Sequence, residues 1–167
     1  MISIHPPYIF KDAISEIKKT LKKNNISSYG ETLVAFEKHI QKYTKAKFVK
    51  CCSSGTAALH VALQIAGIKK NDEVLVPSIT FIATINAVNY VGAKPIFFGC
   101  DKYLNIKTDD VKEFLNKKTF LKNGFTYNKD TKKRISGIIP VHIFGNAANL
   151  EEIIKICKKK KIKIIED

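Results

Sequence analysis

From residue 48 onward, short apolar segments alternate with amphipathic segments, and this alternation limits the possible folds more than any other feature of the chain. The apolar segments predict strands at 48–51, 73–76, 94–98, 135–141 and 163–166. The amphipathic segments predict helices at 56–66, 81–91, 108–115 and 150–160. Short strands that alternate with helices are typical of right-handed crossovers in a mostly parallel sheet. We therefore predict an α/β fold.

The residues before this alternation have a different pattern. Apolar residues at helical spacing predict amphipathic helices at 11–23 and 31–43, after an extended lead-in at 1–10. A polar loop, Ile26-Ser27-Ser28-Tyr29-Gly30, joins the two helices. We expect a helical segment over 1–46 and an α/β domain over 47–167. Within the domain, 117–133 is polar and loop-like, and Tyr127–Thr131 inside it is a hairpin turn or an insertion.

The turn after the first expected strand has the composition of a phosphate-binding loop. Ser54, Gly55 and Thr56 lie where the helix 56–66 begins. A helix start has unpaired N–H groups and a partial positive charge, and a glycine there lets a ligand approach the backbone. The alternative is a helix with a serine cap and no ligand, since Ser and Thr are favoured at that position.

Three further residues follow expected strands and should meet this turn at one edge of the sheet. Ligands of parallel sheets bind beyond the carboxyl ends of the strands, and Phe81, His142 and Asp167 all fall there. Each has a simpler alternative: a core aromatic residue, a structural histidine and a cap of a following helix. Their common placement points to a binding site more strongly than any one of them.

Charge and cysteine content narrow the function classes. The chain carries 29 Lys and Arg against 15 Asp and Glu, a net charge of +14, which is compatible with nucleic-acid binding. Against it, the lysines are spread over many helix faces and Arg134 is the single arginine. The four cysteines form no CxxC pair, so we expect reduced structural thiols and no metal site. Without an apolar run of spanning length or a signal-peptide pattern, we expect a cytoplasmic protein with no membrane contact.

Three stretches of the sequence resemble one family. SSGTAALHVAL, DEVLVPSITFIATINAVNYVGAKPIF and IIPVHIFGNAANLEEI…IIED are similar to the DegT/DnrJ/StrS sugar aminotransferases, which are fold type I enzymes that use pyridoxal phosphate. The resemblance covers nearly the whole chain, and FTYNKDTKKRISGIIPVH resembles the branch that acts on nonulosonic, legionaminic-type sugar precursors. It implies a three-layer αβα sandwich that forms part of the large domain of such an enzyme.

The resemblance also implies roles for individual residues. Ser54, Gly55 and Thr56 would bind the cofactor phosphate, Phe81 would stack on the pyridine ring, and Asp167 would pair with the ring nitrogen. His142 would line the site, and Ser27, Ser28 and Tyr29 would face the sugar nucleotide. The implied reaction transfers an amino group from glutamate to a keto nucleotide-sugar for polysaccharide or surface glycan biosynthesis, in a homodimer.

The chain departs from the family pattern at one point. The Schiff-base lysine of the family lies downstream of the aspartate, in a serine-containing stretch, and none of the lysines here has that context. We therefore expect the N-terminal part of a longer enzyme, without the small domain, with a strand at 48–51 that lacks its neighbours, and inactive alone. A sugar dehydratase of the same family and a catalytically dead remnant are the alternatives.

Overall fold

The computed structural model describes residues 6–24 and 27–167. The chain divides into two compact units, Met1–Cys51 and Cys52–Asp167, which we describe separately. Part of the expected lead-in, residues 1–5, the position Asn25 and the expected loop position Ile26 lie outside the described residues.

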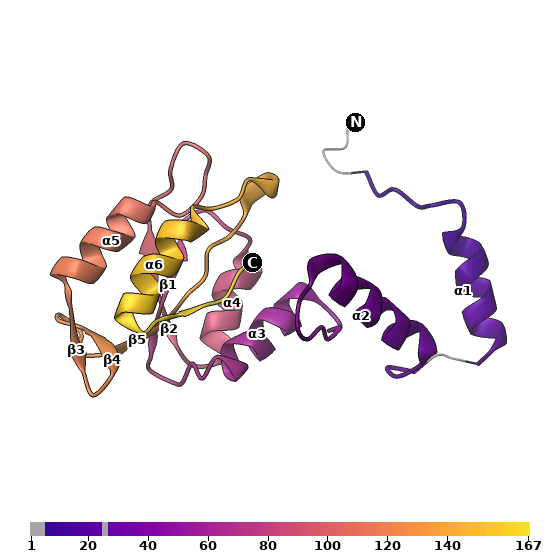
Figure 1. Cartoon of the computed structure of the whole chain (residues 1–167), viewed down its shortest axis with the longest axis horizontal. Coiled ribbons are helices and arrows are strands. Elements are labelled where there is room, and N and C mark those ends of the chain that lie inside the picture. Colours follow the sequence, from indigo (N-terminus) through magenta and orange to yellow (C-terminus); the bar gives the residue numbers. More distant parts are fainter. Residues whose placement is uncertain (1–5, 25–26) are drawn as a thin grey trace. The chain divides into compact units, whose positions relative to one another are not determined.

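Helices α1 (Ala13–Lys22) and α2 (Glu31–Thr44) form the first unit, and both confirm the expected amphipathic helices (Figure 1). The residue buried most completely on α2 is an acid, Glu37. Its carboxylate accepts hydrogen bonds from the Lys50 ammonium at 2.8 Å and from the Cys51 N–H at 3.1 Å. These two donors lower the pKa of Glu37, the Lys50 hydrogen bond most.

The prediction of a strand at 48–51 is wrong. These residues have no strand conformation, and Phe48 is 80% exposed. A strand is stable only when its backbone groups pair with a neighbouring strand, and the described part of the first unit contains helices and no strand for 48–51 to pair with. The Cys51 N–H bonds to the Glu37 side chain instead.

The second unit is built on a six-stranded sheet in the order β2-β1-β5-β4-β3, with β6 paired to β5. The strands are β1 (Glu73–Pro77), β2 (Lys94–Phe98), β3 (Thr119–Lys122), β4 (Phe125–Asn128), β5 (Arg134–Ile138) and β6 (Lys163–Ile164). The central pairs β1–β2, β1–β5 and β5–β6 are parallel, as expected.

The prediction of a polar loop at 117–133 is wrong, because this region contains the strands β3 and β4. These strands form an antiparallel hairpin around Asn123-Gly124, where both residues have positive φ (50° and 77°). Two consecutive positive φ angles define the tight turn that matches the twist of a hairpin. The second suggested turn, at Tyr127–Thr131, lies where β4 turns back antiparallel to β5, so it is a hairpin turn.

Helices cover both faces of the sheet, which gives the predicted three-layer αβα arrangement (Figure 1). The helices are α3 (Gly55–Ile65), α4 (Ile82–Tyr90), α5 (Thr108–Lys117) and α6 (Leu150–Lys160). Successive side chains of a strand point to opposite faces. Val74 and Val76 therefore pack with α3 and α4, whereas Leu75 packs with α5 and α6.

One edge of strand β5 pairs with two other strands, β4 and β6. Its first residues, Arg134 and Ile135, pair with β4, and its last residues, Gly137 and Ile138, pair with β6. Beyond β6 the chain stays hydrogen-bonded to the extension of β5: the Ile165 N–H donates to the Ile138 carbonyl at 3.0 Å. Strands β5 and β6 are both shorter than expected, because Pro140, in the extension of β5, has no N–H to continue the ladder between them.

Candidate functional site

The N-terminus of α3 has the geometry of an anion-binding site. Ser54 is the N-cap residue, with an extended backbone, and its hydroxyl oxygen accepts from the Ala57 N–H at 3.2 Å. The N–H groups of Gly55 and Thr56 begin the helix, where donors have no partner within the helix. A Cβ placed on Gly55 would meet no atom within 4 Å, so a ligand can approach this backbone. The structure thus places all three predicted phosphate-binding residues at a helix start.

Asp167 lies at the end of the chain segment that follows β6, beside α4 (Figure 1). The Thr84 hydroxyl donates to Asp167 Oδ2 at 2.5 Å, and the Thr80 and Thr84 hydroxyl oxygens are 2.8 Å apart. The Asp167 backbone is bonded on both sides. Its N–H donates to the Pro140 carbonyl at 3.0 Å, and its carbonyl accepts from the His142 N–H at 3.0 Å.

One pocket joins these two parts of the candidate site. It has a volume of about 290 Å³ and is lined by Gly55, Ala58, Leu59, Ala62, Ile165, Glu166 and Asp167. We call it the rim pocket, because it lies where the segment after β6 meets α3. Gly55, the first residue of α3, thus lines one part of an apolar pocket, and the segment that carries Asp167 lines another. The structure brings together Gly55 and Asp167, two of the predicted cofactor-binding residues that are 112 positions apart (167 − 55).

Phe81 is the N-cap residue of α4, three positions before Thr84. Its ring is 77% exposed and is therefore accessible to a planar ligand. The Phe81 carbonyl accepts from the Thr84 N–H at 3.1 Å, which ties the aromatic residue to the turn that holds Asp167. The stacking role of Phe81 stays a prediction.

His142 is held in one tautomer. Its Nδ1 accepts a hydrogen bond from the Ala148 N–H at 3.1 Å, so the ring proton of a neutral imidazole lies on Nε2. That Nε2 is 3.2 Å from Glu166 Oε2, to which it donates. Because Glu166 precedes Asp167 and lines the rim pocket, His142 supports the pocket wall through hydrogen bonds.

The three residues predicted to face a sugar nucleotide, Ser27, Ser28 and Tyr29, all lie in the first unit. The Ser27 hydroxyl oxygen accepts from the Tyr29 N–H at 3.3 Å, and the Tyr29 side chain is 79% exposed. Tyr29 lines a separate pocket with Gly30, Glu31, Val34, Ala35 and Lys38. Their role stays a prediction.

Thr80 and Thr84 are not among the site residues predicted from the sequence. Thr84 is fully buried in the first turn of α4, where its hydroxyl reaches a residue 83 positions away. A local signal does exist: the two threonines are spaced four apart across a helix start, where hydroxyl groups often bond to nearby polar atoms. That signal marks a polar cluster without identifying the distant carboxylate.

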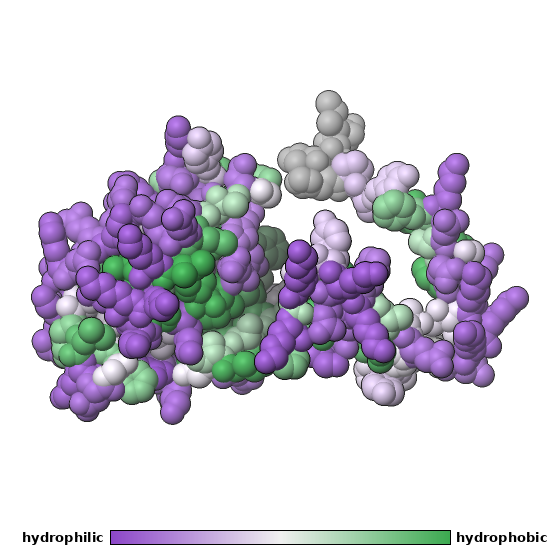
Figure 2. Space-filling view, viewed as in Figure 1, coloured by the Kyte–Doolittle hydropathy of each residue, from purple (hydrophilic) through white to green (hydrophobic). Residues whose placement is uncertain are grey.

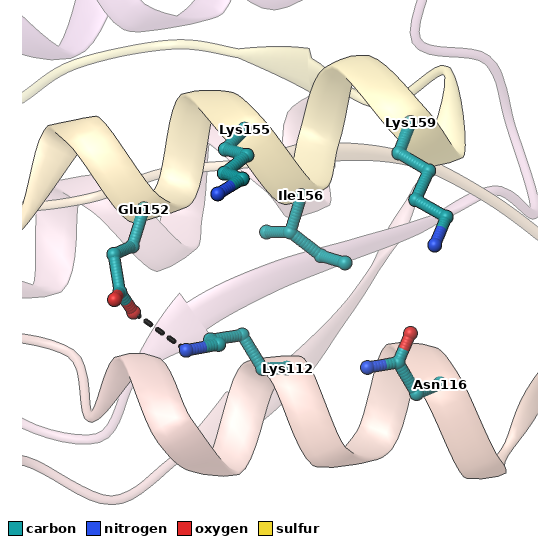
Figure 3. A pocket seen from close by; sticks show the side chains of 6 residues that line it. All are labelled: Lys112, Asn116, Glu152, Lys155, Ile156 and Lys159. Carbon is teal, nitrogen blue, oxygen red and sulfur yellow. Dashed lines mark hydrogen bonds and ion pairs between the residues drawn. The ribbon is translucent and has the colours of Figure 1, made fainter.

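A second pocket, of about 210 Å³, lies between α5 and α6 (Figure 3). We call it the helix groove; its lining residues are Lys112, Asn116, Glu152, Lys155, Ile156 and Lys159. The Lys112 ammonium is 2.7 Å from Glu152 Oε2, and this hydrogen bond raises the pKa of Lys112. Figure 2 shows that mainly hydrophilic residues cover this face of the molecule. None of the predicted site residues lies in the groove.

The single arginine is occupied within the protein. Arg134 Nε donates to Asp72 Oδ1 at 3.0 Å, Arg134 Nη2 donates to the Gly67 carbonyl at 2.9 Å, and the same Nη2 also pairs with Asp72 Oδ2. The Asp72 hydrogen bonds raise the pKa of Arg134. With its best phosphate-binding side chain used internally, the chain's positive charge is mostly exposed lysine, which disfavours specific nucleic-acid recognition.

The fold and the rim pocket together define a class: an α/β domain that presents a helix N-terminus and a carboxylate at the carboxyl edge of a parallel sheet, as in fold type I pyridoxal phosphate enzymes. Residues 7–167 match the model of the DegT/DnrJ/EryC1/StrS aminotransferase family. The chain belongs to this family, which confirms the resemblance seen in the sequence.

Individual relatives agree with this assignment. GDP-perosamine synthase of Escherichia coli O157:H7 is 29% identical over 167 residues, which are 99% of this chain and 42% of that protein. A DegT DnrJ EryC1 StrS aminotransferase from Brucella abortus is 30% identical, with a TM-score of 0.81 over 92% of this chain and 39% of that one. The ntda protein of Bacillus subtilis, with bound cofactor PMP, is 28% identical, with a TM-score of 0.78 over 95% of this chain and 34% of that one.

The chain spans less than half the length of these relatives. In the part of the chain that the structure describes, no helix combines the length and the apolar character needed to cross a membrane.

Proposed function

We propose that this chain supplies the cofactor-binding part of a pyridoxal phosphate-dependent aminotransferase that acts on a keto nucleotide-sugar. The observation that carries the proposal is the rim pocket, which is lined both by Gly55 of the α3 N-terminus and by Asp167, whose carboxylate is held by Thr84. The family membership and the names of the relatives, which include GDP-perosamine synthases and an aminotransferase for a 4-amino-4-deoxy-arabinose nucleotide, support it.

The residues present fit the cofactor. Its phosphate carries negative charge, which suits the open backbone at Gly55 and Thr56 and the positive end of the α3 dipole. Its ring nitrogen suits a carboxylate, and Asp167 supplies one. The apolar side chains of Leu59, Ala62 and Ile165 line the same pocket, where a ring can displace water.

The chain's own residues would set the electronic state of the bound group. When bound, pyridoxal phosphate supplies an electron sink that stabilises negative charge on the carbon next to the amino group. The Asp167 carboxylate favours a protonated ring nitrogen, because opposite charges at contact distance stabilise each other. Phe81, exposed at the start of α4, offers a face for the ring.

Binding of pyridoxamine phosphate to the purified chain tests the proposal, since this form of the cofactor needs no covalent lysine. Titration calorimetry should show binding by the wild-type chain. Gly55→Asp should weaken it by about tenfold or more, because a carboxylate beside the phosphate repels it. The same variant should keep or gain stability, by about 0.3–1 kcal/mol, because an acid at a helix N-terminus is favourable.

Thr108→Asp is the matched control, because Thr108 is the first residue of α5, as Gly55 is of α3. It adds the same charge at a helix start on the other face of the sheet and should leave the affinity unchanged. Equal affinities of Gly55→Asp and wild type would place the phosphate elsewhere. A wild-type chain that fails to bind pyridoxamine phosphate would overturn the proposed function.

The remaining parts of the proposal rest on the family. They are glutamate as the amino donor, a homodimer, a cytoplasmic location, and a division into a helical segment at 1–46 and part of the large domain at 47–167. The product would enter polysaccharide or surface glycan biosynthesis. Because no lysine in the sequence has the family's serine-containing context, we propose that this chain alone does not catalyse transamination.

A further inference from the structure

We propose that Thr84 is a positioning residue for the cofactor. It orients the Asp167 carboxylate so that Oδ2 is bound to the protein and Oδ1 is presented to the ring nitrogen. This inference rests on the proposed function and adds a residue that neither the sequence analysis nor the comparisons assign.

The first support is the contact itself. Thr84 is fully buried, and its hydroxyl is 2.5 Å from Asp167 Oδ2. A buried hydroxyl that loses its partner is costly, so the two groups hold each other in place. Among residues 6–24 and 27–167, Thr84 is the one side chain that donates to this carboxylate, which leaves Oδ1 for a donor on a ligand.

The second support is the direction of the hydrogen bonds. An ionised carboxylate only accepts, so the single hydroxyl proton of Thr84 points to Asp167. The Thr84 oxygen is then an acceptor, and the Thr80 hydroxyl, 2.8 Å away, must be the donor to it. The resulting chain runs from Thr80 to Thr84 to Asp167 and delivers one donor to the carboxylate. A negative carboxylate is the group that a protonated ring nitrogen requires.

The third support is the rigid backbone at Asp167. Its N–H and carbonyl are both bonded, to Pro140 and His142, so the main chain cannot turn freely. The remaining freedom is rotation of the side chain, and the Thr84 hydrogen bond removes it. A carboxylate held in this way needs no reorganisation when the cofactor binds.

The experiment compares two ligands. One is pyridoxamine phosphate, and the other is its analogue in which CH replaces the ring nitrogen. Thr84→Val removes the hydroxyl with little change of shape and should weaken binding of pyridoxamine phosphate by about tenfold, since hydrogen bonds to charged groups have roughly this effect. Binding of the analogue should not change. Thr84→Ser keeps the hydroxyl and should restore the wild-type affinity.

Thr119→Val is the matched control. Thr119 is also buried, and its hydroxyl donates to the Leu115 carbonyl at 2.5 Å, far from the rim pocket in the sheet order. The variant should lower the denaturant midpoint and leave both affinities unchanged. A loss of affinity for both ligands in Thr84→Val would show a general structural effect and overturn the inference. Unchanged binding of both ligands would overturn it as well.

A second measurement needs no cofactor. In a double-mutant cycle of Thr84→Val and Asp167→Ala, followed by urea unfolding, the midpoint loss caused by Thr84→Val should be smaller when Asp167 is already replaced. Additive losses would show that the two side chains do not hold each other and would overturn the inference. A coupled pair in a chain that binds no pyridoxamine phosphate would support the hold on Asp167 and overturn the proposed function alone.

Discussion

The rim pocket and the helix groove are two hollows on the same unit, and they are built from opposite kinds of interaction. The rim pocket is held by short, directed hydrogen bonds around a fully buried threonine, Thr84. The helix groove is lined by three lysines and an ion pair, Lys112–Glu152, whose side chains are 39% and 44% exposed. Water and salt screen exposed charge pairs such as Lys112–Glu152, whereas the Thr84 hydroxyl is fully buried and directs its hydrogen bond to Asp167 from a fixed position.

This contrast shows why the net charge of +14 does not locate the site. Most of the positive charge is on exposed lysines, and hydrophilic residues cover much of the surface seen in Figure 2. The rim pocket has no lysine among its lining residues, which include Gly55 at the α3 N-terminus and the acidic residue Asp167. Orientation of a few groups is therefore the better guide to function in this chain than its summed charge.

The largest effects on stability should come from substitutions in the two cores that lie beneath the rim pocket and the helix groove. The two regions are alike there, because both cores consist of fully buried apolar side chains. Leu63 of α3 and Ile153 of α6 are both fully buried, one on each face of the sheet. Leu63→Ala and Ile153→Ala should each lower the free energy of unfolding by about 2–5 kcal/mol in urea denaturation, because each leaves a cavity.

The control substitutions lie on the same helices. Ile65→Ala and Ile154→Ala replace side chains that are 82% and 50% exposed and should change stability by no more than about 0.5 kcal/mol. If one face tolerated its core substitution, the two-sided core inferred from the alternation of Val74, Leu75 and Val76 would be contradicted.

A smaller effect on stability should show whether the hydrogen bond of His142, and not the packing of its ring, supports the wall of the rim pocket. His142→Ala removes the acceptor of the Ala148 N–H and should cost about 0.5–1.5 kcal/mol of unfolding free energy. His142→Asn keeps an oxygen that can accept that N–H and should recover most of the loss. Equal losses in the two variants would mean that ring packing, and not the hydrogen bond, supports this wall.

The smallest effect should come from the helix groove. Lys112→Met removes the ion pair with Glu152, and the loss of stability should be slight and should shrink as salt is added. The Glu152 hydrogen bond raises the pKa of Lys112, so the pair stabilises the fold below the unfolded-state pKa of lysine, about 10.4. The stabilisation disappears as pH rises through the higher folded-state pKa.

Urea denaturation of wild type and Lys112→Met at pH 7, 9 and 11 measures this dependence. The difference between the two proteins should be constant from pH 7 to 9 and smaller at pH 11. Lys155→Met, on the same groove, is the control for removing a lysine charge alone. A salt-independent loss in Lys112→Met would show that the groove is as tightly built as the rim pocket.

Local signals were enough to predict most of the fold. The helix at 150–160 and the strand at 94–98 form with the expected bounds. In the helix, Asn149 caps the N-terminus, with its side-chain oxygen 3.4 Å from the Glu152 nitrogen, ahead of a regular apolar stripe. The expected strand at 48–51 is just as apolar but does not form, because strand formation depends on a partner elsewhere in the chain. The hairpin around Asn123-Gly124 had a clear local signal that the polarity of 117–133 obscured.

Some residues of the candidate site could likewise be predicted from the sequence, and others could not. Gly55 and Asp167 could be placed at one edge because parallel strands present their carboxyl ends together, and the rim pocket contains both. Thr84 could not be found, because its importance lies in a contact across 83 positions that no local pattern encodes. The roles of Phe81, His142 and the serine–tyrosine loop follow from resemblance and await the binding experiments.

Because β4 and β6 share one edge of β5, the length of the β3–β4 hairpin affects the position of Asp167 along the sheet. Strand β4 stops pairing at Ile135, and β6 begins at Gly137, so the two strands compete for consecutive positions on one edge. The Thr126 hydroxyl donates to the Lys160 carbonyl, which anchors β4 to the end of the helix that precedes β6. An insertion that lengthened β4 by two paired residues would displace β6 and shift the aspartate along β5 by strand invasion. The length of the β3–β4 hairpin therefore limits where β6 can begin on β5 and, with it, where Asp167 lies along that strand.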